Sequence, residues 1–276
     1  MPVPVFSADS PASTERVVPS AASVALAPLL RGPVHTGRVV AATSSIVAVL
    51  VDTPVPDVVC VTSTAGELPC AMAVDGSVPP VAVGAAATVG SGRVQLPGSV
   101  VTTARWRPVR PPVLADPGVA RARAGRCVLP DLPPPLVDRA DALAAALAAA
   151  PTSSSALAEP VRALLGFGPG LTPAGDDVLT AAQVALRAAH DPAAALLAGA
   201  LVAARPFERT TAISAALLRL AATGLAISQL THFVEALGAP AADLSATSAA
   251  LLHVGHTSGA AMCLGAVTAL RERGPA

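Results

Sequence analysis

The spacing of apolar residues changes along this chain of 276 residues. From Arg38 onward, short Val-rich runs are separated by Gly, Pro, Asp and Ser, as in GRVVAATSSIVAVLVD, VVCVTS, PCAMAV, ATVG, GRVQLPG and SVVTTARW. Runs of this length and composition are typical of strands that are joined by tight turns. We therefore expect a compact, mostly antiparallel β barrel or sandwich over residues 38–110.

The segments on either side of this β-rich unit have a weaker pattern. Residues 1 to about 18 look irregular, and residues 21–30 can form one short helix before Gly32 and Pro33, so we assign residues 1–37 to an irregular lead-in with a short helix. Residues 111–135 are rich in Pro and Arg, and prolines prevent a regular element from continuing for long. We assign them to a linker.

The rest of the chain, residues 136–276, is rich in Ala and Leu. Segments of helical length are bounded there by Gly, Pro, Ser, Thr or Asp, which are common at helix ends. The predicted fold is therefore α+β, with a β-rich domain followed by an all-α domain of about eight helices. The predicted helices span residues 136–149, 156–165, 177–189, 193–204, 211–222, 227–236, 241–252 and 258–273.

The stretch GFGPGLTPAGDD, at residues 166–177, joins two of these predicted helices. Its glycines permit backbone conformations that are closed to other residues, and its two prolines stiffen the path. The unpaired amide groups and the dipole at the start of the next helix can hold an anion. We expect a small anionic substrate to contact this loop, at Gly168, Gly170, Leu171, Thr172 and Gly175.

Asp176 and Asp177 lie side by side at the end of this loop, and three interpretations of them stay open. Asp176 can be an N-cap and Asp177 a first-turn residue that the helix dipole favours. Alternatively, the pair can hold a divalent cation such as Mg²⁺ that bridges to a phosphate. The third interpretation is that the carboxylates accept hydrogen bonds from a substrate amide or amine. The loop is neither a Walker loop nor a dinucleotide fingerprint, because no Lys follows its last glycine and it joins helix to helix.

The segment ERTTAIS brings a second polar cluster, Arg209, Thr210, Thr211 and Ser214, to the start of another predicted helix. Thr210 can cap this helix, and Thr210 and Ser214 share one face because they are four residues apart. Hydroxyls and a guanidinium are good ligands for an oxyanion. A capping threonine and a solvated arginine would give the same pattern.

A third cluster lies in HVGHTSGAAMCLG. Gly255 can end one helix, and Thr257 or Ser258 can cap the next. His256 precedes that helix and can donate to an anionic substrate or act as an acid or base. The alternative, for His256 and also for His253, is a histidine that only completes the local structure. The spacing does not assemble a Ser-His-Asp triad.

Composition excludes several classes of function. All 18 basic residues are Arg and balance 18 acidic residues, and aromatic residues make up 2% of the chain, so neither a basic surface nor stacking platforms for nucleic acid are expected. The absence of Lys, Asn and Tyr fits a bacterial genome rich in GC. The four cysteines are scattered, without a CxxC spacing, which argues against a zinc site or a disulfide framework.

The mean hydropathy of +0.61 is high, yet the wholly apolar run at residues 192–204 is too short to cross a bilayer. The N-terminus lacks the basic start and long apolar core of a signal peptide. We therefore expect a cytoplasmic protein that does not interact with membranes.

The three clusters together resemble a bacterial family once known only as a domain of unknown function, associated with the smallest subunit of oxamate carbamoyltransferase in anaerobic allantoin degradation. The resemblance covers roughly residues 39–270 and is carried by GxGPGLTPxGDD, by TTxIS at residues 210–214 and by GHTSG at residues 255–259. The first motif is the most specific. Ala174 replaces the serine expected from the family, and Ala260 and Ala261 replace its usual Trp and Asp.

The resemblance implies an enzyme of purine catabolism that works in a complex with two larger partner subunits. The reaction it implies is a carbamoyl transfer. It exchanges carbamoyl phosphate and oxamate for oxalurate and phosphate. The backbone of the loop, with Arg209 and Thr211, would then bind anionic groups. Asp176 or Asp177 would accept from the substrate amide or hold a metal, and His256 with Ser258 would complete the pocket.

Two other functions remain possible. The chain can be a non-catalytic subunit whose loop binds a metabolite or docks a partner, or a metal-dependent phosphohydrolase that uses the two carboxylates and Mg²⁺. No cofactor is required by the sequence pattern itself.

Overall fold

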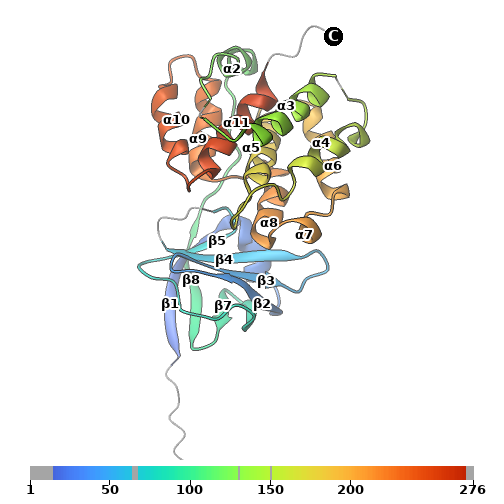
Figure 1. The fold of residues 1–276 in the computed structure, drawn as a ribbon. Helices are drawn as coiled ribbons and strands as arrows, with labels where there is room; N and C mark the ends of the chain where they lie inside the picture. Colours follow the sequence, from blue (N-terminus) through green and yellow to red (C-terminus); the bar gives the residue numbers. More distant parts are fainter. Residues whose placement is uncertain (1–14, 64–67, 130, 150, 272–276) are drawn as a thin grey trace, which may run out of the picture.

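The computed structural model describes residues 15–63, 68–129, 131–149 and 151–271. It has two parts, a β barrel and, stacked on it, a group of helices (Figure 1). No helix within these ranges has both the length and the apolar character needed to cross a bilayer.

The barrel is closed, with the strand order β1-β5-β4-β3-β2-β6-β7-β8. The pairs β1–β8 and β4–β5 are parallel and the other neighbouring pairs are antiparallel, so the predicted mostly antiparallel β unit is a barrel. Closure leaves no unpaired sheet edge. The strands are β1 Arg16–Ser23, β2 His35–Ala42, β3 Ile46–Val51, β4 Asp57–Ser63, β5 Ala71–Val74, β6 Ala86–Gly90, β7 Arg93–Leu96 and β8 Ser99–Arg107.

The first strand corrects the prediction of an irregular lead-in over residues 1–37, of which residues 1–14 lie outside the described ranges. β1 has Pro19 in its middle and mostly small residues after it, so it lacks the Val-rich pattern of the other strands. The parallel pairing with β8, which lies far away in sequence, supplies its partner. The predicted helix at 21–30 is a 3₁₀ turn, η1 Val24–Leu26, followed by the short helix α1 Ala27–Arg31.

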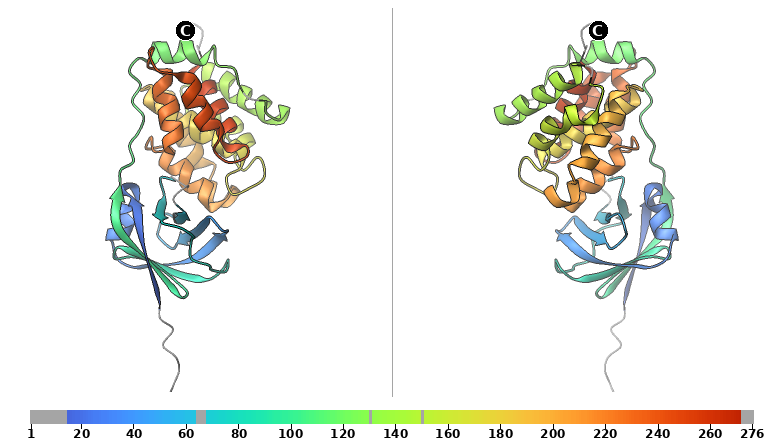
Figure 2. Two further views of the ribbon diagram at one scale, coloured as in Figure 1. Left: turned by 90° about the vertical axis from the view of Figure 1, so that its left-hand side faces the viewer. Right: turned by 90° about the vertical axis from the view of Figure 1, so that its right-hand side faces the viewer.

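The Pro- and Arg-rich segment at 111–135 is also more regular than predicted. It contains α2 Pro117–Ala124, whose first two amides, those of Gly118 and Val119, donate to the Asp116 side chain. Proline at the first helical position is compatible with a helix because its missing N–H would have no intrahelical partner. Figure 2 shows the stretch before α2 rising along one side of the molecule from the barrel to the helices.

The predicted all-α part is confirmed in outline, with boundaries that differ from the sequence pattern. The acid pair does not start its helix, because α5 begins three residues earlier than predicted, and η2 and α7 are short extra turns. The elements are α3 Pro134–Ala148, η2 Ser154–Leu157, α4 Ala158–Leu164, α5 Ala174–Ala188, α6 Ala193–Ala203, α7 Pro206–Arg209, α8 Ala212–Ala221, α9 Ser228–Leu237, α10 Leu244–Leu252 and α11 Ser258–Leu270.

Helix α5 is the centre of the helical part, since most of its residues are buried. It packs closely on α11, where a Cβ at Gly265 would lie 2.2 Å from the carbonyl oxygen of Val178. Helix α8 connects this part to the barrel, because Ile213, Ala216 and Leu217 belong to the barrel's core cluster. The start of α8 and the loop before α5 therefore lie on the barrel side of the helices (Figure 1).

Replacing Gly265 by Ala should destabilise the fold by about 1–3 kcal/mol, because the added methyl group forces α5 and α11 apart. Urea unfolding followed by circular dichroism measures the change. Gly125→Ala is the matched control: its Cβ would meet its nearest neighbour at 3.7 Å, an ordinary contact. Equal stability of the Gly265→Ala protein and the parent would contradict the close approach of these helices.

Candidate functional site

Three segments that are distant in sequence meet at the starts of three helices, α5, α8 and α11. The hydroxyl of Thr211, before α8, donates to the carbonyl oxygen of Leu171 at 2.6 Å. The hydroxyl of Thr172 lies 3.1 Å from that of Ser258, the first residue of α11. The GFGPGLTPAGDD loop is therefore held by contacts to both of the other motifs.

Asp176 connects the loop to the start of α8. Its Oδ1 accepts from the Gly166 amide at 2.7 Å, and its Oδ2 accepts from the Thr210 hydroxyl. The interpretation of Asp176 as an N-cap is wrong, because Pro173 occupies the cap and Asp176 is the third residue of α5. Pro173 provides the extended backbone that a helix start needs, and this frees the carboxylate for the contacts outside the helix.

Asp177 has the opposite environment. It is 2% exposed, and its Oδ2 has no hydrogen-bond partner among the described residues. Burial raises the pKa of Asp177 well above its ordinary value; the hydroxyl of Ser258 opposes this increase, and the charge of Asp176 adds to it. A buried carboxyl group without a partner costs free energy, so its presence here calls for a functional reason.

Burial also raises the pKa of Asp176, but three donors oppose the increase: the amide of Gly166 and the hydroxyls of Thr210 and Ser214. The Ser214 hydroxyl contributes least and has no hydrogen-bond partner of normal geometry within the described ranges. Asp176 is thus a fixed structural acceptor, whereas Asp177 keeps an oxygen free to accept or donate.

The threonines of the second motif have different roles from those predicted. Thr211, and not Thr210, is the N-cap of α8, since its hydroxyl accepts from the Ser214 amide at 3.1 Å. Thr210 is used instead to bind Asp176. Both hydroxyls are therefore engaged within the protein.

The loop itself divides into an exposed tip and a buried end. Gly168, Gly170 and Leu171 are exposed, and both glycines have a positive φ, of 110° and 101°. Gly175 is buried, and its amide donates to the Phe167 carbonyl oxygen at 2.8 Å, so it is not free to bind a substrate as predicted. A Cβ at Gly175 would lie 2.0 Å from the Leu164 carbonyl oxygen, which explains the glycine by packing.

Three other predicted site residues lie at the surface. Arg209, His256 and Thr257 are exposed, and none of them contacts the two acids in a described hydrogen bond. His256 and Thr257 directly precede Ser258, so they lie at the rim of the cluster. Thr257 occupies the N-cap of α11 without forming a side-chain cap.

One residue of the cluster was missed in the sequence analysis. The amide of Gly166 is a main donor to Asp176, and the residue has a φ of 73° with the Arg209 carbonyl oxygen 2.6 Å from a Cβ placed there. A backbone amide leaves no side-chain signal, and only the glycine pattern could have suggested it.

The comparison with known families bears on these three motifs. Residues 164–270 match the family model of oxamate carbamoyltransferase subunit AllH. This match confirms the family resemblance that the motifs indicated. It begins at the end of α4, contains the whole loop and both other clusters, and leaves the barrel outside. No solved structure matches the chain.

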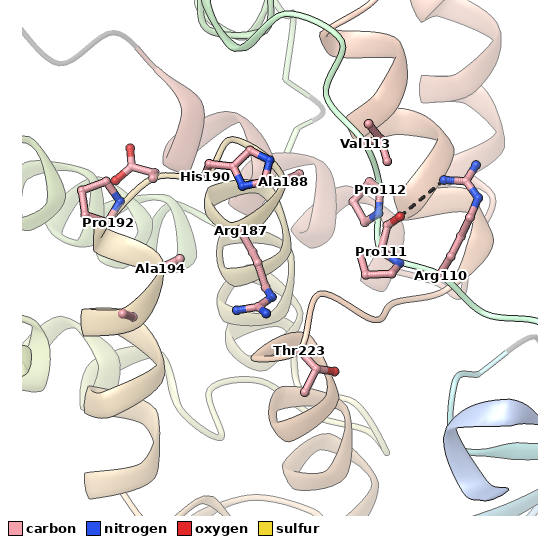
Figure 3. A pocket seen from close by; sticks show the side chains of 12 residues that line it. Arg110, Pro111, Pro112, Val113, Arg187, Ala188, His190, Pro192, Ala194 and Thr223 are labelled. Atoms are coloured by element: carbon pink, nitrogen blue, oxygen red, sulfur yellow. Dashed lines mark hydrogen bonds between the residues drawn. The ribbon is translucent and has the colours of Figure 1, made fainter.

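The motif cluster lies at the start of α5, whereas a large cleft lies near the other end of this helix. This cleft, of about 650 Å³, is lined by Arg187, His190 and Thr223 among others (Figure 3). Arg187 lies 11 positions beyond Asp176, which corresponds to about 16 Å along the helix. The two acids do not line this cleft.

The cluster is a poor fit for a divalent cation. Both oxygens of Asp176 already accept from protein donors. Within the ranges that the structure describes, no group of three or more His, Cys, Asp and Glu side chains is arranged to hold a metal ion. The geometry suits a hydrogen-bonding group better than an ion that demands several oxygen ligands.

Stability should depend on pH through Asp177. The pKa of Asp177 is raised on folding, so the stability linked to it is complete below about pH 4, the ordinary range of Asp, and is lost as pH rises through the folded value. Asp177→Asn removes the charge and should flatten this decline in urea unfolding midpoints between pH 4 and pH 8. An unchanged profile would contradict the raised pKa.

The neighbouring substitution, Asp176→Asn, should behave differently. An amide cannot accept from both the Gly166 amide and the Thr210 hydroxyl, so one donor loses its partner. We expect a loss of about 1–3 kcal/mol at neutral pH, measured by the same unfolding experiment. A neutral effect would show that these two contacts do not hold the loop.

Proposed function

We propose that this chain is the small subunit of a carbamoyltransferase complex and that its motif cluster takes part in the reaction. The complex would transfer a carbamoyl group from carbamoyl phosphate to oxamate or to a similar small amide or amine. The observation that carries the proposal is the free oxygen of buried Asp177, inside a cluster built from all three motifs of the AllH match.

The chemistry of carbamoyl transfer suits this arrangement. The acceptor nitrogen attacks the carbamoyl carbon, the bond from that carbon to the phosphate oxygen breaks, phosphate leaves, and the nitrogen loses a proton. A carboxylate with a raised pKa is a stronger base than an ordinary one, so Asp177 can take that proton or hold the N–H in place. Its position would orient the acceptor, which contributes to the rate by itself.

Charge at the cluster also favours anionic reactants. The starts of α5, α8 and α11 meet here, and each carries the partial positive charge of a helix N-terminus. The exposed tip around Gly168 and Gly170, with Arg209 and His256 at the surface, would provide the remaining contacts to phosphate or to the oxamate carboxylate.

In this proposal Asp177 acts only when the chain is part of the complex. Its side chain is covered, whereas the loop tip and His256 are exposed. The proposal therefore includes partner subunits, two in number as in the resemblance, that cover the exposed rim and form the rest of the substrate pocket. A magnesium ion is not part of the proposed step.

A second candidate is a non-catalytic subunit that uses the loop to dock a partner. The observation that favours it is the exposure of the tip, with Leu171 38% exposed. A third, the metal-dependent phosphohydrolase, has less support because both oxygens of Asp176 are occupied by protein donors. The phosphohydrolase is tested by measuring phosphate release from carbamoyl phosphate in the absence of an acceptor. The measurement is made with and without added Mg²⁺.

Asp177→Asn should lower the rate of carbamoyl phosphate consumption by the assembled complex about 100-fold or more, because the reaction loses its base. The complex is first purified by size exclusion, so that assembly and activity are measured on the same sample. Asp141→Asn, at an exposed position on α3, is the control and should keep full activity.

The catalytic role and the docking role predict different results for the Asp177→Asn chain. If the Asp177→Asn chain assembles into the complex and the complex has lost its activity, the result supports a catalytic role. Full activity of the Asp177→Asn complex would refute that role, and failure of a folded Asp177→Asn chain to assemble would favour the docking subunit.

A further inference from the structure

The large cleft near the end of α5 has a volume of about 650 Å³, which is within the usual range of small-molecule sites. Its walls come from the end of α5, the start of α6, the stretch before α2 and the loop after α8. Most of the lining is apolar and includes Pro111, Pro112 and Pro192 together with alanines of α5 and α6. Proline rings restrict the backbone, so these walls are largely preformed.

The charged side chains that line the cleft differ in their partners. Arg110 forms an ion pair with Glu235, and Asp191 forms one with Arg121. Arg187 is exposed and has neither an ion pair nor a side-chain hydrogen bond within the described ranges. The negative end of the α5 dipole offsets part of its charge but leaves its donors without a partner. Among the described residues of the cleft, Arg187 is therefore the arginine that lacks a counter-charge.

The hydrocarbon stem of Arg187 is packed, while its guanidinium group stays available. Gly224, after α8, has a φ of 87°. A Cβ at Gly224 would lie 3.3 Å from the Cδ of Arg187 and 3.0 Å from the ring of Pro111. The bare backbone of this glycine therefore lets the arginine stem approach the proline. Figure 3 shows the Arg187 side chain directed from α5 toward Thr223.

His190 brings a second polar group to the cleft. Its amide donates to the Arg187 carbonyl oxygen and the Asp191 amide donates to that of Leu186, both at 3.0 Å, so that α5 ends in a Schellman motif. The left-handed position of this motif usually holds glycine, but here His190 occupies it with a φ of 51°. Its imidazole lies at the cleft wall and has no hydrogen-bond partner in the described part of the chain (Figure 3). An unfavourable backbone conformation at a cleft is an indication of function.

We propose that this cleft binds a small organic carboxylate with a hydrocarbon body. The carboxylate pairs with the guanidinium of Arg187, His190 supplies a further donor, and the body packs on the proline rings. One uncompensated guanidinium matches a single negative charge and the two oxygens of a carboxylate, whereas a phosphate monoester carries about −1.5 to −2 charges at pH 7. The cleft lies at the other end of α5 from the motif cluster, and this inference does not depend on the proposed function.

Titration of the ¹⁵N-labelled full-length chain, followed by its amide NMR signals, tests the proposal. The probes are phenylacetate and hexanoate, which join one carboxylate to an aromatic or a linear body, at constant ionic strength set with sodium chloride. Acetate has the charge without the body, and phenylacetamide has the body without the charge.

The proposal expects at least one probe to shift the amide signals of His190 and Gly224 in a saturable way, with acetate and phenylacetamide at least about tenfold weaker. The tighter probe identifies the body that the cleft prefers. If neither probe gives saturable shifts there, or if acetate or phenylacetamide binds as tightly as the better probe, the proposal is overturned. No carbamoyl phosphate or partner subunit is present, so the result is separate from that of the transferase assay.

Arg187→Gln should weaken binding of the better probe at least about tenfold, because it removes the charged donor. Arg162→Gln is the matched control, since Arg162 is also an exposed arginine in the last turn of a helix, α4, but lies outside the cleft. It should leave the affinity unchanged. Equal loss in the two variants would mean a general charge effect and would count against the site.

A second pair of variants tests the location without changing charge. Ala195 is exposed on α6 and lines the cleft, so Ala195→Phe should fold normally and weaken binding severalfold because its ring takes the place of the ligand body. Ala203→Phe, at an exposed position of the same helix outside the cleft, should bind as the parent does. Undiminished binding by the Ala195→Phe chain would contradict the proposed location.

Discussion

The carboxylate of Asp176 is the contact on which the arrangement of the motif cluster depends. It accepts from the amide of Gly166, ten positions before it, and from the hydroxyl of Thr210, 34 positions after it. One buried side chain thereby fixes the path of the loop and the start of α8 relative to α5. The cost of burying this carboxylate is offset by donors on both oxygens, which is the usual condition for a buried charge.

Adjacent acids at the start of one helix have separate roles in this structure. Both oxygens of Asp176 accept hydrogen bonds, whereas Asp177, beside Ser258, has one oxygen without a partner among the residues that the structure describes. A one-residue step along a helix turns the side chain by about 100°, so the two carboxylates face different neighbours. The motif is therefore partly a packing element, as Gly175 shows, and partly the holder of one buried carboxyl group that the protein does not saturate within the described residues.

The division of the fold into a β part and an α part was visible in the sequence, because Val-rich runs and Ala- and Leu-rich runs differ in residue type and spacing. The strand β1 was missed because it contains Pro19 and is fixed by β8 through long-range pairing. The helix α2 was missed because proline is usually a sign of an interrupted helix, whereas Pro117 stands in the first turn, where a helix tolerates it. Local propensity could not predict either element.

The site was predictable as a set of residues but not as an arrangement. The spacing of polar residues suggested a polar cluster at each of three helix starts. The family resemblance then indicated that the three clusters belong together. Which threonine caps α8 and which binds Asp176 depends on backbone geometry that neighbouring Thr210 and Thr211 do not reveal.

Asp177 is a buried acid that has one oxygen without a partner among the described residues and an altered affinity for protons. Carboxyl ¹³C NMR of the aspartate-labelled chain measures this directly, with the two signals assigned from the Asp176→Asn and Asp177→Asn proteins. Aspartic acid ordinarily titrates near pH 4, and the Asp177 signal should titrate well above that range. Titration of that signal at or below 4 would contradict it.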